Sequence, residues 1–148
     1  MTTLQELMSN YILKVIVVAW ASAQILKTII DFVVTKNFKS ERLVGAGGMP
    51  SAHSAFVSSL MVATGKQCGF ASPEFAISFA LAIVVMYDAM GVRHAAGEQA
   101  KAINHIIDRF EEFSKIDIPY DDLKEFLGHT PIEVIAGALL GITIAFII

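Results

Sequence analysis

Two histidines stand where apolar segments begin, and histidine can act as a nucleophile or a proton donor near neutral pH. His53 lies in the glycine-rich string GAGGMPSAHS, residues 45–54, and His129 lies in the string GHTPIE, residues 128–133. A lone histidine at a helix start is more often a hydrogen-bonded structural group. Two histidines at two helix starts on the same side of a protein indicate a shared reaction site.

The glycine-rich string favours an anion as its ligand. Glycines let the backbone approach a ligand closely, and a helix start offers free N–H groups and the positive end of the helix dipole. We therefore predict that Gly48 and Ser51 bind phosphate, with Pro50 in the first helical turn and Ser51 either capping the helix or donating to a phosphate oxygen. The alternative is a flexible loop that leads into a capped helix.

The string YDAMGVR, residues 87–93, places a carboxylate and a guanidinium near the end of another apolar segment. Arg93 would contact two oxygens of a phosphoryl transition state at once, or would mark the membrane boundary in an ion pair with Asp88 or Glu98. Asp88 is a functional candidate because a carboxylate at membrane depth is costly. It would orient Arg93 or His53, bind a divalent ion such as Mg²⁺ together with Glu98, or form an interfacial salt bridge.

Apolar segments must position these groups. The 148 residues are 55% hydrophobic and 17% charged, with a mean hydropathy of +0.61, which excludes a disordered chain, a nucleic-acid-binding module and a disulfide scaffold. We predict an all-α integral membrane bundle that forms a single domain over residues 1–148, with the second segment buried by the others. Lys14 and Lys27 in the first segment are expected to extend toward the membrane boundary. Four segments approach the roughly 20 helical residues that span a bilayer core, namely 10–34, 51–64, 72–92 and 131–148.

Residues 93–130 combine much of the charge with a helical spacing of apolar residues. We predict an amphipathic helix at the membrane interface, followed by a short helix at about residues 120–127. If each segment crosses the bilayer, residues 35–50 and 93–130 share one side, which carries eight Lys and Arg residues against Lys66 alone on the other. The positive-inside rule then predicts that this side, which holds both histidines, is the cytoplasmic side of the cell (inner) membrane.

Two patterns near the C-terminus have structural interpretations. TPIE at residues 130–133 is a capping box with proline at the first helical position, so Glu133 would serve the helix rather than His129. One glutamate is not expected to do both well. Gly137 and Gly141 form a small-x3-small pair that would suit a homodimer interface.

The strings PSAH at residues 50–53 and H-x3-E at residues 129–133 together resemble the type 2 phosphatidic acid phosphatase superfamily. That superfamily includes lipid phosphatases and vanadium haloperoxidases and carries the motifs K-x6-R-P, P-S-G-H and S-R-x5-H-x3-D. The strings GGMPSAHSA, YDAMGVR and LKEFLGHTPIEV are more similar still to its divergent branch of small membrane proteins, and they are spread over nearly the whole chain.

The resemblance implies a phosphatase site. His129 matches the histidine that attacks phosphorus, Glu133 takes the position of the aspartate that orients that imidazole, and His53 matches the histidine that protonates the leaving oxygen. These residue types suit the chemistry, because an imidazole nitrogen can attack only when the other nitrogen holds the proton, and a carboxylate partner enforces that state.

The chain departs from the superfamily motifs at three places. Ala52 replaces the glycine of the second motif, and five residues rather than six separate Lys36 from Arg42, which Leu43 follows in place of proline. The Ser-Arg pair of the third motif falls on residues 122–123, an Asp-Leu pair, so another cation must stabilise the phosphoryl group. The candidates are Arg93 and Lys124, and after them Lys36, Lys39 and Arg42.

We therefore expect a metal-independent phosphomonoesterase or diphosphatase that works on a phosphorylated lipid of the bilayer, needs no cofactor and binds no nucleic acid. Its catalytic residues would be His129, His53, Glu133 and Asp88. Two alternatives stay open: a Mg²⁺-assisted phosphotransferase that uses Asp88 and Glu98, and a non-enzymatic transport or scaffold subunit whose polar groups hold helices together.

Overall fold

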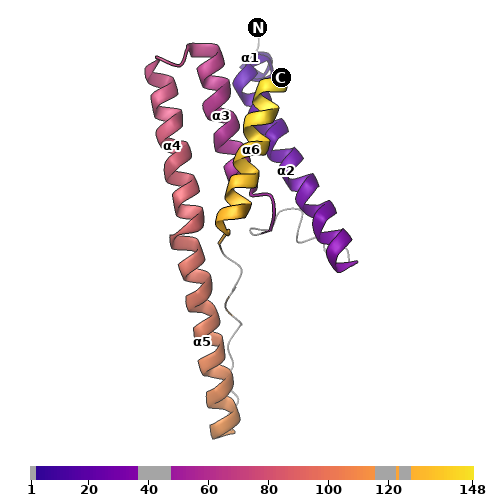
Figure 1. Ribbon diagram of the computed structural model, residues 1–148, viewed down its shortest axis with the longest axis vertical. Coiled ribbons are helices and arrows are strands. Elements are labelled where there is room, and N and C mark those ends of the chain that lie inside the picture. Colours follow the sequence, from indigo (N-terminus) through magenta and orange to yellow (C-terminus); the bar gives the residue numbers. More distant parts are fainter. Residues whose placement is uncertain (1–2, 37–47, 116–122, 124–127) are drawn as a thin grey trace.

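The computed structural model describes residues 3–36, 48–115, 123 and 128–148, with the side chains of residues 92–94 and 111 left aside. The regular elements in this part of the chain are all α-helices, and Figure 1 shows them as a bundle with one long extension. The predicted all-α membrane bundle is confirmed. Its helices are α1 (Thr3–Ser9), α2 (Tyr11–Thr35), α3 (Ala52–Cys68), α4 (Pro73–Met90), α5 (Val92–Ser114) and α6 (Pro131–Ile147).

The bundle is built around α3. This helix packs against α2, α4 and α6, and ten of its 17 residues are buried. Most of the buried residues are Ala, Ser, Gly and Thr, whose small side chains let neighbouring helices approach closely. The prediction that the second segment is buried by the others is confirmed.

Two glycines of α6 make the closest approach to α3. A Cβ atom on Gly137 would lie 2.2 Å from the carbonyl oxygen of Ser51, and one on Gly141 would lie 2.2 Å from that of Ala55. Both glycines are buried. The prediction of a homodimer interface through Gly137 and Gly141 is therefore wrong, because the small-x3-small pair is used inside the chain.

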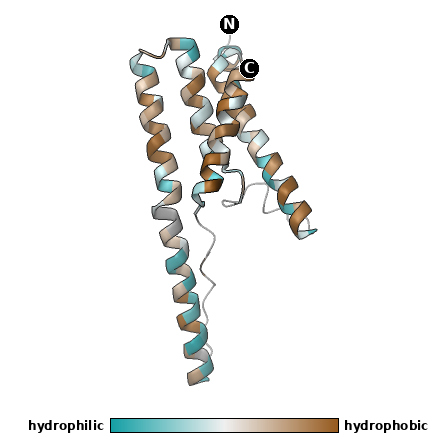
Figure 2. Cartoon of the chain, in the orientation of Figure 1, coloured by the Kyte–Doolittle hydropathy of each residue, from teal (hydrophilic) through white to brown (hydrophobic). Residues whose placement is uncertain are grey.

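The outer helices carry the lipid-facing surface. Tyr11–Thr35 and the continuous stretch Pro73–Ser114 are long and apolar enough to cross a membrane, and Pro131–Ile147 is a shorter apolar helix. Large apolar side chains on α2, α4 and α6 point outward rather than into the bundle, and Figure 2 shows the brown, hydrophobic colour along these helices. Exposed apolar side chains are compatible with a bilayer, because lipid, unlike water, does not drive apolar side chains into the protein interior.

One end of the bundle collects the predicted site. Figure 1 shows α2 and α4 running toward this end and α3 and α6 starting from it, while the two termini lie at the opposite end. Backbone hydrogen bonds join the elements there, with the Ser51 N–H donating to the Glu133 carbonyl (3.0 Å) and the His129 N–H donating to the Ala89 carbonyl (3.0 Å). The sequence-based expectation that His53 and His129 share one side is confirmed.

The segment after α4 continues as α5, which extends beyond the bundle and contacts only α4 among the described helices. The predicted helix in this segment is confirmed, while its place at the membrane interface stays a prediction. The predicted short helix at residues 120–127 lies outside the described residues except for Leu123.

Candidate active site

The start of α3 is a capped helix whose first turn carries His53. The Ser51 hydroxyl accepts hydrogen bonds from the backbone N–H of Ser54 (3.3 Å) and from the Ser54 hydroxyl (3.0 Å), and Ser51 is fully buried. Pro50 lies one residue before the cap, so its predicted place in the first helical turn is wrong. His53 is exposed at the second position of the helix.

The start of α6 is a complete capping box that also holds His129. The Thr130 hydroxyl accepts from the Glu133 N–H (3.4 Å), and the Glu133 carboxylate accepts from the Thr130 N–H (2.9 Å). The same carboxylate oxygen, Oε2, lies 3.2 Å from Nδ1 of His129. The expectation that one glutamate could not serve both the cap and the histidine is wrong, because a single oxygen accepts from both directions.

His129 is buried and is held by hydrogen bonds to two helices. It is 5% exposed, its backbone N–H is bonded to Ala89 on α4, and its ring is bonded to Glu133 on α6. Because Nδ1 faces the carboxylate, Nε2 is the ring nitrogen left for a substrate. A carboxylate on Nδ1 keeps the proton there and leaves Nε2 as the nucleophile.

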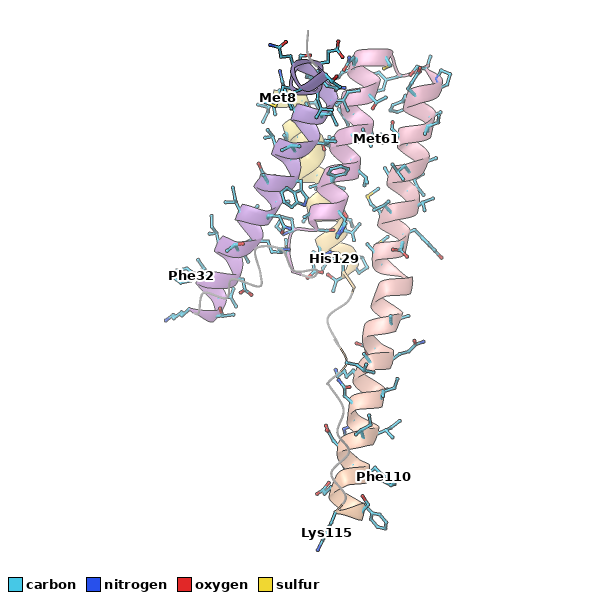
Figure 3. The ribbon with its side chains drawn as sticks, turned by 180° about the vertical axis from the view of Figure 1, so that it is seen from behind. Met8, Phe32, Met61, Phe110, Lys115 and His129 are labelled. Atoms are coloured by element: carbon cyan, nitrogen blue, oxygen red, sulfur yellow. The ribbon has the colours of Figure 1, made fainter. Side chains whose placement is uncertain are left out.

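The two imidazoles face one another across the space between the helix starts. Their ring centroids are 6.4 Å apart and the ring planes are inclined by 61°. This is an edge-type contact within the range of paired rings, so the two imidazoles lie next to each other at the helix starts. Figure 3 labels His129 at the end of the bundle from which α3 and α6 start.

Asp88 and Arg93 flank the contact between α4 and the α6 start. Asp88 is half-buried and precedes Ala89, whose carbonyl holds the His129 backbone. Arg93 is the second residue of α5, and its side chain lies outside the described part of the chain. The fold thus brings the backbone at Ala89, within the YDAMGVR string, to His129.

Lys27 is a site residue that sequence reasoning missed. It is 4% exposed, and a Cβ atom on Gly48 would lie 3.2 to 3.3 Å from its side-chain carbons, so the Lys27 stem lies against Gly48. The prediction that Lys27 extends to the membrane boundary is wrong. Lys14, on the same helix, is exposed. Position 48 suits glycine for two reasons. Its φ of +85° is a conformation that other residues rarely adopt, and the Lys27 stem leaves little space for a Cβ atom.

Of the other predicted cations, only Lys36 lies within the described residues. Lys36 caps the C-terminus of α2 and is exposed, and Figure 3 shows Phe32, one turn earlier, far to the side of His129. Lys39, Arg42 and Lys124 lie outside the described residues.

Asn104 is a second residue that the sequence did not reveal. Its amide nitrogen donates to the Leu123 carbonyl (3.0 Å) and its amide oxygen accepts from the Leu123 N–H (3.1 Å), so one side chain satisfies both backbone polar groups of Leu123. Asn104 is buried although it lies on a helix that is mostly exposed. This pair of bonds holds the chain at Leu123 against α5, ahead of the histidine at the α6 start.

The metal-assisted alternative fits the geometry poorly. Glu98 lies ten residues beyond Asp88 on a helical path that keeps its direction from α4 into α5 (Figure 1), and a rise of 1.5 Å per residue puts their backbones about 15 Å apart. Within the described residues, no three His, Cys, Asp or Glu side chains are placed to hold one ion. These two carboxylates therefore cannot share a metal in this arrangement.

The arrangement has the parts that phosphoryl transfer needs. It offers a carboxylate-oriented imidazole, a second imidazole on the opposite helix start, a buried lysine beside Gly48, and a helix N-terminus. In a comparison with known protein families, the family described as "Divergent PAP2 family" matches residues 8–144 of the chain.

The chain belongs to the divergent PAP2 family. The matched range includes both histidines, Glu133 and the YDAMGVR string. A similar protein is the membrane protein YuiD of Bacillus subtilis (strain 168), described as uncharacterized, which is 38% identical over 152 residues, covering 97% of this chain and 96% of the relative. No solved structure matches the chain. The divergent PAP2 assignment and the similarity to a membrane protein agree with the apolar outer helices.

Proposed function

We propose that this divergent PAP2 protein is a membrane lipid phosphatase that hydrolyses a phosphomonoester or diphosphate through a phosphohistidine on His129. The observation that carries the proposal is the bond between Nδ1 of His129 and Oε2 of Glu133, with a second histidine ring 6.4 Å away. A capping box alone would need the glutamate but would not need a buried histidine on it.

Nucleophilic attack starts from the free ring nitrogen. Nε2 of His129 attacks phosphorus, and the bond from phosphorus to the leaving alcohol oxygen breaks. His53 delivers a proton to that oxygen, so the alcohol leaves neutral. Glu133 stabilises the positive charge that develops on the His129 ring.

Water completes the cycle. His53, now neutral, accepts a proton from a water molecule that attacks phosphorus, and the phosphorus–nitrogen bond breaks. Inorganic phosphate leaves, and both imidazoles return to their starting states. The steps need no metal and no cofactor.

The phosphoryl oxygens need positive charge and N–H donors. Arg93 remains the first candidate for the missing arginine of the third motif, because its helix begins beside the α4 residues that hold His129. Lys27 is the second, since its stem lies against Gly48, which leads to Ser51 and His53. Asp88 is a positioning residue between these groups, and Gly48, with the first N–H groups of α3, supplies backbone for the anion.

The decisive experiment is a phosphate-release assay of the purified chain in detergent. The panel contains phosphatidic acid, lysophosphatidic acid, isoprenyl diphosphates and an aryl phosphate, each with and without EDTA. We expect release from at least one lipid that EDTA does not reduce. Release that EDTA abolishes would favour the metal-assisted alternative, and no release from any substrate would favour a transport or scaffold subunit.

Lys27 can be tested against a matched lysine on the same helix. Lys27→Met keeps the buried stem and removes the charge, so we expect the KM for phosphate substrates to rise or kcat to fall, while Lys14→Met, at an exposed position, leaves both unchanged. Equal behaviour of the two variants would remove Lys27 from the site.

We further propose that the site faces the cytoplasm. The chain has a single cysteine, Cys68, which is exposed at the end of α3 opposite the histidines. A membrane-impermeant maleimide should therefore label Cys68 in intact cells or, in a bacterium with an outer membrane, in spheroplasts. Labelling that occurs only after the membrane is broken would place the site on the opposite leaflet.

A further inference from the structure

An apolar groove begins at His53. It has a volume of about 400 Å³ and is lined by Trp20 from α2, by His53, Phe56 and Val57 from α3, and by Leu81 and Val85 from α4. Apart from the imidazole, every side chain in this wall is hydrophobic. The groove therefore joins one proposed catalytic group to a purely apolar surface.

The groove exists because two helices share a neighbour without touching one another. Among the described residues, α2 and α4 each pack on α3, and no contact joins α2 to α4. The groove lies on α3 between these two helices. Figure 3 shows α3 between α2 and α4, with the yellow α6 at the back. The floor is Val57, which is buried, while Trp20 and Leu81 form partly exposed edges.

Among the described residues, close contacts join the start of α3 to α6 and the start of α6 to α4. The Ser51 N–H bonds to Glu133, the His129 N–H bonds to Ala89, and Gly137 lies in contact with the Ser51 backbone. These contacts seal α3 against α6 and the α6 start against α4. His53 itself is exposed and lies at the start of the groove.

We propose that this groove holds the hydrocarbon chain of the leaving alcohol. The inference rests on the proposed function and adds to it. In an in-line displacement, the leaving oxygen lies opposite the attacking nitrogen, so a phosphate attacked by His129 and protonated by His53 has its alcohol on the His53 side. That is where the groove starts.

The position of the groove beside His53 and its apolar lining together indicate which kind of ligand it binds. An apolar wall continuous with the proton donor selects an alcohol with a long alkyl or isoprenyl chain, because each methylene that leaves water contributes to binding. A soluble sugar or nucleoside phosphate would place polar groups against Phe56, Val57 and Leu81 without hydrogen-bond partners, which is unfavourable. Leu81 and Trp20 at the edges are thus specificity-determining residues for chain-bearing substrates.

The first test uses two tryptophan substitutions on α4. Leu81→Trp fills the groove from its edge, and Ile83→Trp adds the same bulk at a position of similar exposure that does not line the groove (44% and 49% exposed). The substrates are hexadecyl phosphate and butyl phosphate in detergent, and kcat/KM is measured for each.

We expect the wild-type protein to prefer hexadecyl phosphate. Leu81→Trp should lower kcat/KM for that substrate roughly tenfold or more, the effect of losing about two buried methylene groups, and should leave butyl phosphate nearly unchanged. Ile83→Trp should change neither. Absence of a chain-length preference, or equal losses in the two variants, would overturn the groove assignment while leaving the phosphatase activity in place.

The second test does not need turnover. Trp20 is the only tryptophan of the chain, so its fluorescence reports on the groove. A hexadecyl phosphate brominated near the middle of its chain should quench Trp20 saturably, and the unbrominated compound should restore the signal. Saturable quenching without phosphate release would refute the phosphatase activity and support the groove assignment. Phosphate release without saturable quenching would support the phosphatase activity and refute the groove assignment.

Discussion

The starts of α3 and α6 are built from the same parts in a different order. Each is capped by a hydroxyl side chain, Ser51 or Thr130, and each carries a histidine and a nearby proline. At α3 the histidine follows the cap by two residues and is exposed, whereas at α6 it precedes the cap and is 5% exposed. Position relative to the cap therefore decides whether the imidazole is held inside or stands at the edge of the groove.

The same difference assigns the chemical roles. A histidine before the cap lies within reach of the N3 side chain, so Glu133 can hold both the cap and the ring. A histidine inside the first turn, such as His53, lies at the groove and is exposed. A fixed ring suits a nucleophile, which needs one orientation and one tautomer, and an accessible ring suits a group that must give and take protons.

Removal of His129 should have the largest effect. His129→Ala leaves no other nucleophile in the proposed mechanism, so phosphate release should fall to the level of the protein-free assay and no acid-labile phosphoprotein should form. His105→Ala, at an exposed position on α5, is the matched control and should behave as wild type. A phosphoryl adduct that persists in His129→Ala would make His53, rather than His129, the nucleophile.

Substitution of Gly137 should break the contact that keeps the two helix starts together. A Cβ atom there would lie 2.2 Å from the Ser51 carbonyl oxygen and 3.1 Å from the Ser51 nitrogen, which are backbone atoms of a helix cap and cannot move independently. We expect Gly137→Ala to lower stability by about 1–3 kcal/mol or more, measured by thermal unfolding in detergent. Leu139→Ala, at an exposed position of the same helix, is the control. A wild-type melting temperature for Gly137→Ala would show that the α3–α6 contact is looser than described.

His53→Ala should separate substrates by leaving group. General acid catalysis is worth roughly 10² to 10⁴ in rate, so an alkyl phosphate should lose about that much. An aryl phosphate should lose far less, because a phenol oxygen leaves with little help. Rates on the two substrates are compared in the same preparation, and equal losses would contradict the role of His53 as the acid.

Much of this site could be predicted from the chain alone. Apolar segments of bilayer length indicated the helices, and counting crossings put His53 and His129 at one end. Capping chemistry located the starts of α3 and α6 to within a residue, although Pro50 fell outside the helix rather than in its first turn. Helix periodicity and cap motifs are local signals, so a single sequence carries them.

The contacts that local signals could not reveal depend on which helix lies beside which. Gly137 and Gly141 have the same pattern whether their partner is α3 or a second copy of the chain. For Lys27 a signal was available: Val15, Ala19 and Ala23 are all completely buried at a spacing of four, and Lys27 continues that stripe. Asn104 likewise continues a stripe from Ala100. A polar residue that extends a stripe of small buried residues indicates a buried partner rather than an extended side chain.

Glu133→Gln should test whether the carboxylate serves the ring or only the cap. Glutamine is accepted at N3 of a capping box, so the helix start should be retained, while the charge that stabilises the His129 ring is lost. We expect a fall in kcat of roughly 10- to 100-fold, the range for a hydrogen bond to a charged group, and an unchanged melting temperature. A variant that melts early and keeps full kcat would assign Glu133 to the cap alone.

Thr130→Ala should give the complementary, smallest effect. The substitution removes the hydroxyl that accepts from the Glu133 N–H, and loss of such a cap costs about 1 kcal/mol of stability. The Thr130 backbone N–H and the His129 ring still reach Oε2 of Glu133, so kcat should change little. Thr130→Ser keeps the hydroxyl and should match wild type in both measurements. If Thr130→Ala instead lowers kcat as far as Glu133→Gln does, the cap and the catalytic pair are one unit, and the start of α6 cannot be separated into a structural half and a chemical half.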